Sequence, residues 1–331
     1  MQMKKFINRP EDIVSELLQG FVLSHPEKVR LAGSNLVART RNKTSGKVGL
    51  VVLGGSGHEP GLSGFVGEGM LDVSVPGEIF AAPGAPRCLE GIRLADRGAG
   101  VLFIVLNHSG DVLSANMTMG MAEKERLKVK KIVTHEDIAG GPNLNDRRGL
   151  VGFVPVYKVA GAAAEQGLSL DKCLELAERM ERNTRTLAVA VSTATHPSTG
   201  HRIFELGDDE MEIGMGQHGE AGSGRMKLKT ANDTADLMLQ MLLDDLKVKP
   251  GEELLVLVNG AGATTLMELF IVFRRVHQVL QEKKIKPVRS KVGEFITTQE
   301  QGGFQLMISR MDPELLRLWD APCDAPYFVV R

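Results

Sequence analysis

The chain has 331 residues, a length typical of two domains and sufficient to bury a core without disulfides or metals. Hydrophobic residues make up 43% and charged residues 24% of the chain, a globular composition that excludes a disordered protein. The 40 basic and 41 acidic side chains leave a net charge of −1, so no overall charge attracts the chain to nucleic acid or to an anionic membrane.

The first half of the chain predicts alternating helices and strands. A helix is expected from about residue 10. The apolar runs 47–53 and 100–106 each end in a glycine-containing turn, which indicates buried parallel strands, and a helix at 86–97 lies between them. This order predicts a crossover connection and a parallel sheet. A long helix is expected at 160–182.

The second half begins with a strand at 186–191 and a polar loop at 192–200. The remaining expected elements are a helix at 232–246, a strand at 253–258, a helix at 264–281, and strands at 291–297 and 303–309. We therefore predict an α/β protein with two α/β domains, residues 1–184 and 185–331. Each is built on a mainly parallel or mixed sheet with flanking helices.

Compartment and membrane signals point to the cytoplasm. No apolar run reaches the roughly 18 residues that span a bilayer. The N-terminus becomes polar by Asn8, so we expect no signal peptide. Cysteines 88, 173 and 323 have no metal or redox spacing, and their odd number suits a reducing compartment.

Glycine is over-represented, with 37 of 331 residues (about 11%) against about 7% in average proteins. The first predicted strand runs into the loop Gly54-Gly55-Ser56-Gly57-His58-Glu59-Pro60. Open α/β sheets bind ligands at the carboxyl ends of their strands, and glycines leave backbone N–H groups free for a ligand. Neither a Walker phosphate loop nor a dinucleotide fingerprint matches. His58 is thus a candidate proton carrier; the alternatives are a solvated loop histidine and a helix cap.

Two further segments have candidate chemical residues. The second strand runs into Asn107–Asp111, where Asp111 either caps the next helix or accepts a proton from a ligand hydroxyl. Asp111 and His58 follow strands expected to be adjacent, so we expect a shared cleft. His218 lies between glycines in 214–222, as a candidate nucleophile. A surface loop and a metal ligand are the alternatives, and the absence of a compact ligand triad disfavours the metal.

These segments together resemble the substrate-binding (K) subunit of dihydroxyacetone kinase over almost the whole chain. Nine ordered motifs have this resemblance: Met3–Asn8, Gly54–Pro60, Pro76–Phe80, Asn107–Asp111, Arg147–Gly149, Gly161–Glu165, Glu210–Gly214, His218–Glu220 and Leu318–Pro322.

The resemblance implies a function that composition does not show. The histidine matching His218 adds to the ketone carbonyl of the substrate and holds it as a covalent hemiaminal. His58 and Asp111 match acid/base partners of the ketose hydroxyls. The expected pocket lining is Gly54, Gly55, Ser56, Gly57, Phe80 and Ala82.

The resemblance also implies partners. The K subunit is a homodimer without a metal or cofactor of its own, and ATP or ADP with Mg sits on a separate L subunit. We therefore expect a phosphotransferase subunit that is inactive alone, with no nucleic-acid or membrane partner. Because the chain ends soon after its second predicted domain, we expect no fused nucleotide domain.

Departures from the family pattern alter the expected lining. Ala81-Ala82 replaces a usual Thr-Ser, Leu106, His108 and Ala115 replace a lysine, a tyrosine and a phenylalanine, and Ala221 replaces a proline. These changes predict a different short ketose, such as a four-carbon tetrulose. The alternative function is a ketose-sensing regulator that binds a transcriptional activator; retention of His58 and Asp111 favours the enzyme. A third alternative, a metal-dependent hydrolase that uses the scattered histidines, is the least favoured of the three.

Overall fold

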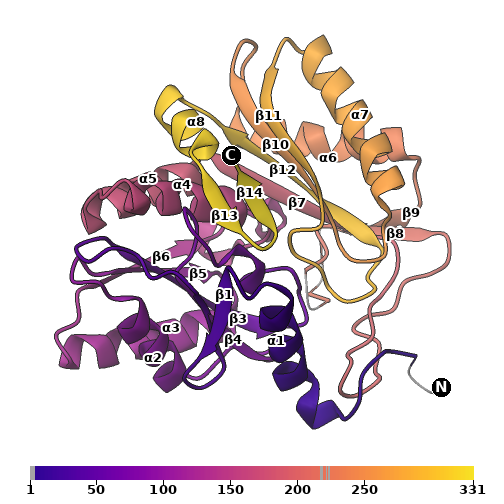
Figure 1. Ribbon diagram of the computed structural model, residues 1–331. Helices are drawn as coiled ribbons and strands as arrows, with labels where there is room; N and C mark the ends of the chain where they lie inside the picture. The colour runs from indigo at the N-terminus through magenta and orange to yellow at the C-terminus, as the bar shows by residue number, and fades with distance from the viewer. Residues whose placement is uncertain (1–3, 217–218, 221, 223) are drawn as a thin grey trace.

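The computed structural model describes residues 4–216, 219–220, 222 and 224–331. Within these residues the chain forms two six-stranded sheets and a two-stranded hairpin, and α-helices pack against both large sheets (Figure 1). Short 3-10 helices lie at Pro10–Asp12, Ser63–Phe65, Ile138–Gly140 and Leu144–Asp146. None of the described helices has the length and apolar character needed to cross a bilayer.

The first sheet is mixed, with a parallel centre. Its strands, in spatial order, are β1 (Val29–Ala32), β2 (Leu36–Arg39), β4 (Val73–Ile79), β3 (Gly49–Ser56), β5 (Val101–Leu106) and β6 (Val129–Thr134). The strands from β4 to β6 are parallel, and β1 and β2 are antiparallel to their neighbours. The helices of this half are α1 (Ile13–Ser24), α2 (Ala85–Ala95), α3 (Ser109–Lys124), α4 (Phe153–Glu165) and α5 (Leu170–Arg182).

The second sheet is mixed, with mainly antiparallel pairing. Its strands, in spatial order, are β11 (Lys286–Gly293), β10 (Glu253–Gly260), β12 (Gly303–Arg310), β7 (Thr184–Ala190), β8 (Glu210–Ile213) and β9 (Gly224–Lys227). Only β10 and β11 are parallel among these described pairs. The other elements are α6 (Ala231–Leu246), α7 (Leu266–Glu282), α8 (Pro313–Asp320) and the hairpin of β13 (Cys323–Ala325) and β14 (Phe328–Val330).

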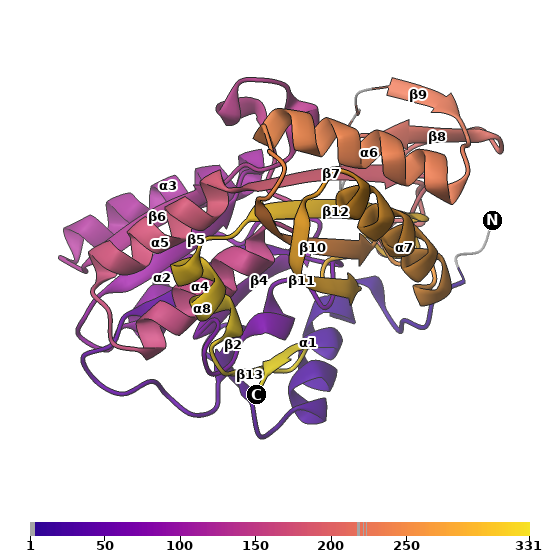
Figure 2. The same ribbon diagram turned by 90° about the horizontal axis from the view of Figure 1, so that it is seen from above.

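Helix α4 lies at the centre of the molecule. Every residue from Phe153 to Ala164 is buried, as expected for a helix whose residues are nearly all apolar. One hydrophobic cluster joins α4 to Val52 and Ile104 of the first sheet and to Leu257 of the second. The layers therefore run from α2 and α3 through the first sheet, α4 with α5, and the second sheet to α6 and α7 (Figure 2).

The predicted fold class is confirmed, and two predicted elements are wrong. Residues 160–182 are not one helix, because the chain turns at Gly167 with φ of +79° and Ser169 caps α5 by accepting from the Lys172 N–H. The strand predicted at 291–297 lies at Lys286–Gly293 instead. Beyond this strand, the backbone N–H groups of Phe295 and Ile296 donate to the side chain of Asn259 instead of to a neighbouring strand.

The division into domains at 184/185 stays a prediction. Strand β7, the first strand of the second sheet along the chain, begins at Thr184. The C-terminal elements, however, return to the first half: Leu318, Trp319 and Phe328 share the hydrophobic cluster of α4. In Figure 1 these elements, in yellow, lie beside α4.

Candidate active site

A cavity of about 370 Å³ opens at the carboxyl ends of β3 and β5. The two strands are adjacent and parallel, so the segments that follow them leave the same edge of the sheet. His58 lines the cavity from the segment after β3, Asp111 from the first turn of α3, and Glu220 from the second half of the chain. The predicted shared cleft of His58 and Asp111 is therefore present.

His58 is held in one orientation by the second half of the chain. Its side chain is buried, and Nδ1 lies 2.7 Å from the carbonyl oxygen of Thr297. Because a carbonyl oxygen only accepts hydrogen bonds, Nδ1 has the proton of the neutral ring. Nε2 is then the nitrogen with a lone pair, which suits a base. The ring also packs on Phe80, with centroids 4.9 Å apart.

Asn259 fixes the segment that holds His58. Its amide oxygen accepts from the N–H groups of Phe295 and Ile296, and its amide nitrogen donates to the Ile296 carbonyl at 2.8 Å. Thr297 follows directly and donates its hydroxyl to the Glu59 carbonyl at 2.7 Å. The orientation of His58 thus depends on a fully buried amide at the end of β10.

Gly55 allows the backbone that presents Phe80 to approach β3. A Cβ on Gly55 would lie 2.7 Å from the Ala81 nitrogen and 3.0 Å from the Phe80 carbonyl carbon. Any side chain here would push that segment away. The glycine therefore brings the Phe80 ring to His58, and His196 packs edge-on against Phe80 with ring centroids 5.3 Å apart.

Asp111 lies in the first turn of α3, with 8% of its surface exposed. The N-cap of this helix is His108, so Asp111 is not the capping residue. The N-terminus of a helix stabilises a carboxylate through the free N–H groups of its first turn. His108 also lines the cavity, and its Nε2 lies 2.9 Å from the Gly149 carbonyl oxygen, to which it donates.

The structure brings together most of the predicted site residues. Gly54, Gly55, Phe80 and Ala82 line the same cavity as His58 and Asp111. The hydroxyl of Ser56 donates to the Gly77 carbonyl, and the carbonyl of Gly57 accepts from the Gln299 amide. His218 lies outside the described residues. The chemical roles of all these residues stay predictions.

Sequence reasoning missed several residues of the site. His108 was noted only as the replacement of a tyrosine, with no chemical role of its own, and neither Glu220 nor Ile296 was expected in the lining. Glu220 had a signal, since it lies two residues after His218 in a glycine-rich segment. Thr297 had none, because it meets His58 across 239 residues of sequence.

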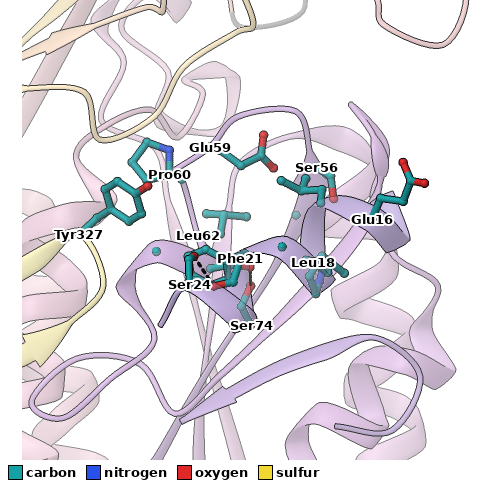
Figure 3. Close-up of a pocket in the computed structure, with 18 residues that line it drawn as sticks. Glu16, Leu18, Phe21, Ser24, Ser56, Glu59, Pro60, Leu62, Ser74 and Tyr327 are labelled. Atoms are coloured by element: carbon teal, nitrogen blue, oxygen red, sulfur yellow. Dashed lines mark hydrogen bonds between the residues drawn. The ribbon is translucent and has the colours of Figure 1, made fainter. Parts of the chain in front are cut away.

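A second cavity of about 370 Å³ lies against the same glycine segment (Figure 3). Gly54, Gly55 and Leu62 line both cavities. The second is lined further by α1, by Ser74 and by Glu59, whose carboxylate accepts from the Gly57 N–H at 3.0 Å. Burial raises the pKa of Glu59, and hydrogen bonds from backbone N–H groups partly oppose this. The consecutive residues His58 and Glu59 therefore line different cavities.

The family model of the Dak1 domain matches residues 19–327. This chain belongs to the Dak1 family. The predicted family resemblance is thereby confirmed. Among its relatives, the dihydroxyacetone-binding subunit DhaK of the PTS-dependent dihydroxyacetone kinase 1 of Listeria innocua is 41% identical over 315 residues, 94% of this chain and 95% of that protein.

Two other relatives of this Dak1 chain differ in their described activities. The L-erythrulose kinase of Pectobacterium atrosepticum is 38% identical over 98% of this chain, which spans 56% of that longer protein. A solved structure of the dihydroxyacetone kinase operon co-activator Dha-DhaQ has a TM-score of 0.89 at 30% identity, and the match covers 95% of this chain and 98% of that one. The Dak1 fold therefore occurs in kinase proteins and in a co-activator.

Proposed function

We propose that this chain is the ketose-binding subunit of a dihydroxyacetone-type kinase and acts in the cytoplasm as a homodimer. The strongest support is that His58 and Asp111, which follow two adjacent strands, line one cavity. Glu220 lines the same cavity. The 41% identity to a dihydroxyacetone-binding subunit adds independent support.

The proposed first step is covalent capture of the ketose by His218. A neutral imidazole nitrogen donates its lone pair to the ketone carbon, and the π electrons of the carbonyl move to the oxygen. The proton lost from the other ring nitrogen ends on that oxygen, so the hemiaminal forms without a further reactant. A polyol without a carbonyl, such as glycerol, cannot react. Capture therefore selects ketoses against the many hydroxylated molecules in a cell.

The proposed second step is phosphoryl transfer to a hydroxyl of the captured ketose. Positioning and charge stabilisation dominate this reaction, and a fixed substrate supplies the positioning. Asp111 accepts the proton of the ketose hydroxyl. The unprotonated Nε2 of His58 accepts a hydrogen bond from the substrate. A separate L-type subunit holds the nucleotide, ATP or ADP with Mg, and the transferred phosphoryl group comes from ATP or from a phosphotransferase relay. Alone, the chain has no kinase activity.

The lining favours a ketose larger than dihydroxyacetone. Ala81, Ala82 and Leu106 offer methyl and isobutyl groups to the cavity, with no hydroxyl or ammonium group among them. They leave room for an additional hydroxymethyl group. A four-carbon tetrulose such as erythrulose fits this pattern, in agreement with the 38% identity to an L-erythrulose kinase.

Carbon NMR of carbonyl-labelled dihydroxyacetone and erythrulose tests the proposal. With the wild-type chain, we expect the ketone signal to move to the tetrahedral-carbon region, with erythrulose saturating at the lower concentration. With His218→Ala, the signal should stay at the free ketone position, because no nucleophile is present. His201→Ala is the matched histidine control, because His201 is exposed and lies outside the helices and strands. Absence of any shift with the wild-type chain would refute the capture step.

A second candidate function is a ketose-sensing regulator that binds a transcriptional activator. The observation that favours it is the TM-score of 0.89 and 30% identity to a co-activator of a dihydroxyacetone kinase operon. An assay with an active L subunit, phosphoryl donor and each ketose separates the two functions. Phosphorylated ketose supports the kinase. Capture without any product would refute the kinase and support the regulator.

A further inference from the structure

Two consecutive arginines connect the two halves of the molecule, and they reach different targets. Arg147 donates from both terminal nitrogens to Asp245 on α6, at 3.0 and 2.6 Å. Arg148 donates to Asp137 at 2.8 Å from Nε, and to the Gly214 carbonyl at 2.6 Å from Nη2. Because the two arginines are adjacent in the chain, a variant of one is a matched control for a variant of the other. Of the two side chains, that of Arg148 reaches the segment that contributes Glu220 to the cavity.

The Arg148–Asp137 pair is shielded from water. The side chain of Asp137 has no exposed surface, and that of Arg148 is 14% exposed. An ion pair in this setting is screened little by salt, and its planar guanidinium has a fixed orientation. Asp137 therefore anchors Arg148 in the first half through Nε and Nη2, and the two terminal nitrogens also reach carbonyl groups of the second half.

Arg148 reaches both ends of one turn, formed by residues 214–216 and 219–220 (the 214–220 turn). Besides the Gly214 carbonyl, its Nη1 lies 3.5 Å from the Glu220 carbonyl oxygen. The Glu220 carbonyl also accepts from the Gly216 N–H at 2.9 Å. A Cβ on Gly216 would lie 2.3 Å from Arg148 Nη1 and 2.0 Å from the Glu220 carboxylate. A side chain at this position would displace the ends of the Arg148 and Glu220 side chains.

The turn contributes directly to the cavity. Glu220 lines it together with His58 and Asp111, which both belong to the first half of the chain. In the sequence, His218 lies between Gly216 and Glu220. The relative position of the two halves of the site thus depends on what joins this turn to the first half.

We propose that Arg148, anchored by Asp137, is a positioning residue that fixes the 214–220 turn against the first half and so aligns it with His58 and Asp111. The effect on ketose capture rests on the proposed function. The effect on the turn itself does not. Arg148 touches no reacting atom in this arrangement; it acts through the turn.

The first test compares ketose capture in Arg148→Ala and Arg147→Ala by carbon NMR titration with labelled erythrulose. Loss of a charge-assisted hydrogen bond to the turn should weaken capture about tenfold or more in Arg148→Ala. Arg148→Lys should show an intermediate affinity for the ketose, because an ammonium group keeps the charge but not the planar geometry of the guanidinium donors. Arg147→Ala loses a comparable link between the halves and should lower the melting temperature while capture persists. Wild-type affinity in folded Arg148→Ala would overturn the proposal.

Hydrogen exchange of the segment 211–225 tests the turn without any ketose. Arg148→Ala should accelerate exchange of the Gly216 amide, which donates within the turn, whereas Arg147→Ala should leave it at the wild-type rate. Unchanged exchange in Arg148→Ala would refute the positioning role even if this variant captures ketose more weakly. If the wild-type chain captures no ketose, the proposed function fails, and this exchange measurement still decides the role of Arg148.

Discussion

Replacing Asp111 with asparagine should lower the rate of phosphoryl transfer about 10²- to 10⁴-fold while covalent ketose capture persists. Asparagine has the size of the carboxylate, but its amide does not accept a proton from the ketose hydroxyl. Asp111 lies at a helix N-terminus and lines the cavity beside the segment of His58, so the loss should affect transfer more than folding.

Two measurements on each variant separate transfer from capture. A coupled assay with the L subunit at saturating erythrulose gives the turnover rate, and carbon NMR gives the captured fraction. Asp244→Asn is the matched control, since Asp244 is exposed on α6 and accepts from Gln240. A turnover rate within about twofold of wild type would show that Asp111 is not the proton acceptor. Loss of capture along with turnover would make it a binding residue instead.

Sequence patterns located the strands that position the site, because those strands are buried on both faces. The runs at 47–53 and 100–106 became β3 and β5, and their C-terminal ends brought His58 and Asp111 to one cavity. Helix α4 was harder to delimit. Its apolar residues face all directions, so residues 153–159 lack the one-sided period that marks a helix boundary.

The parts of the site that sequence reasoning missed are contacts between segments far apart in the chain. Asn259 redirects the backbone after β11 and thereby places Thr297 against His58. Arg148 reaches Gly214 across 66 residues. An asparagine after a buried strand and an arginine in a loop have many ordinary roles, and no local pattern marks these two. Their roles follow only from the packing of the two halves.

The stability of the wild-type chain should fall relative to that of Glu136→Gln as the pH rises from about 5 to 8. Glu136 is buried, and one carboxylate oxygen accepts from the N–H groups of Leu150 and Gly152. Oε2 has no hydrogen-bond partner among the described residues. Burial raises the pKa of Glu136 to about 7; backbone hydrogen bonds oppose this, and the nearby carboxylates of Glu181 and Asp137 add to it.

The sign follows from where the proton is held. Between the ordinary pKa of 4.5 and about 7, the folded chain keeps the Glu136 proton and the unfolded chain releases it, so folding weakens as the pH rises through this window. The shift of about 2.5 pKa units corresponds to roughly 3 kcal/mol. Glutamine cannot ionise and resembles the protonated acid. The variant should therefore match wild type only below the ordinary pKa of 4.5, and exceed its free energy of unfolding by about 1 kcal/mol at pH 5 and by roughly 3 kcal/mol at pH 8.

Urea unfolding of both chains at several pH values between 5 and 8 measures this gap. Many other groups titrate over the same range, but their contributions are common to the two chains and cancel in the difference. Glu205→Gln, which removes an exposed carboxylate, should show no comparable change with pH. A constant gap between wild type and Glu136→Gln would mean that Glu136 is already ionised at pH 5 in the folded chain. The two backbone N–H groups of Leu150 and Gly152 would then outweigh burial, and the loop that presents Arg148 would be held by a charge.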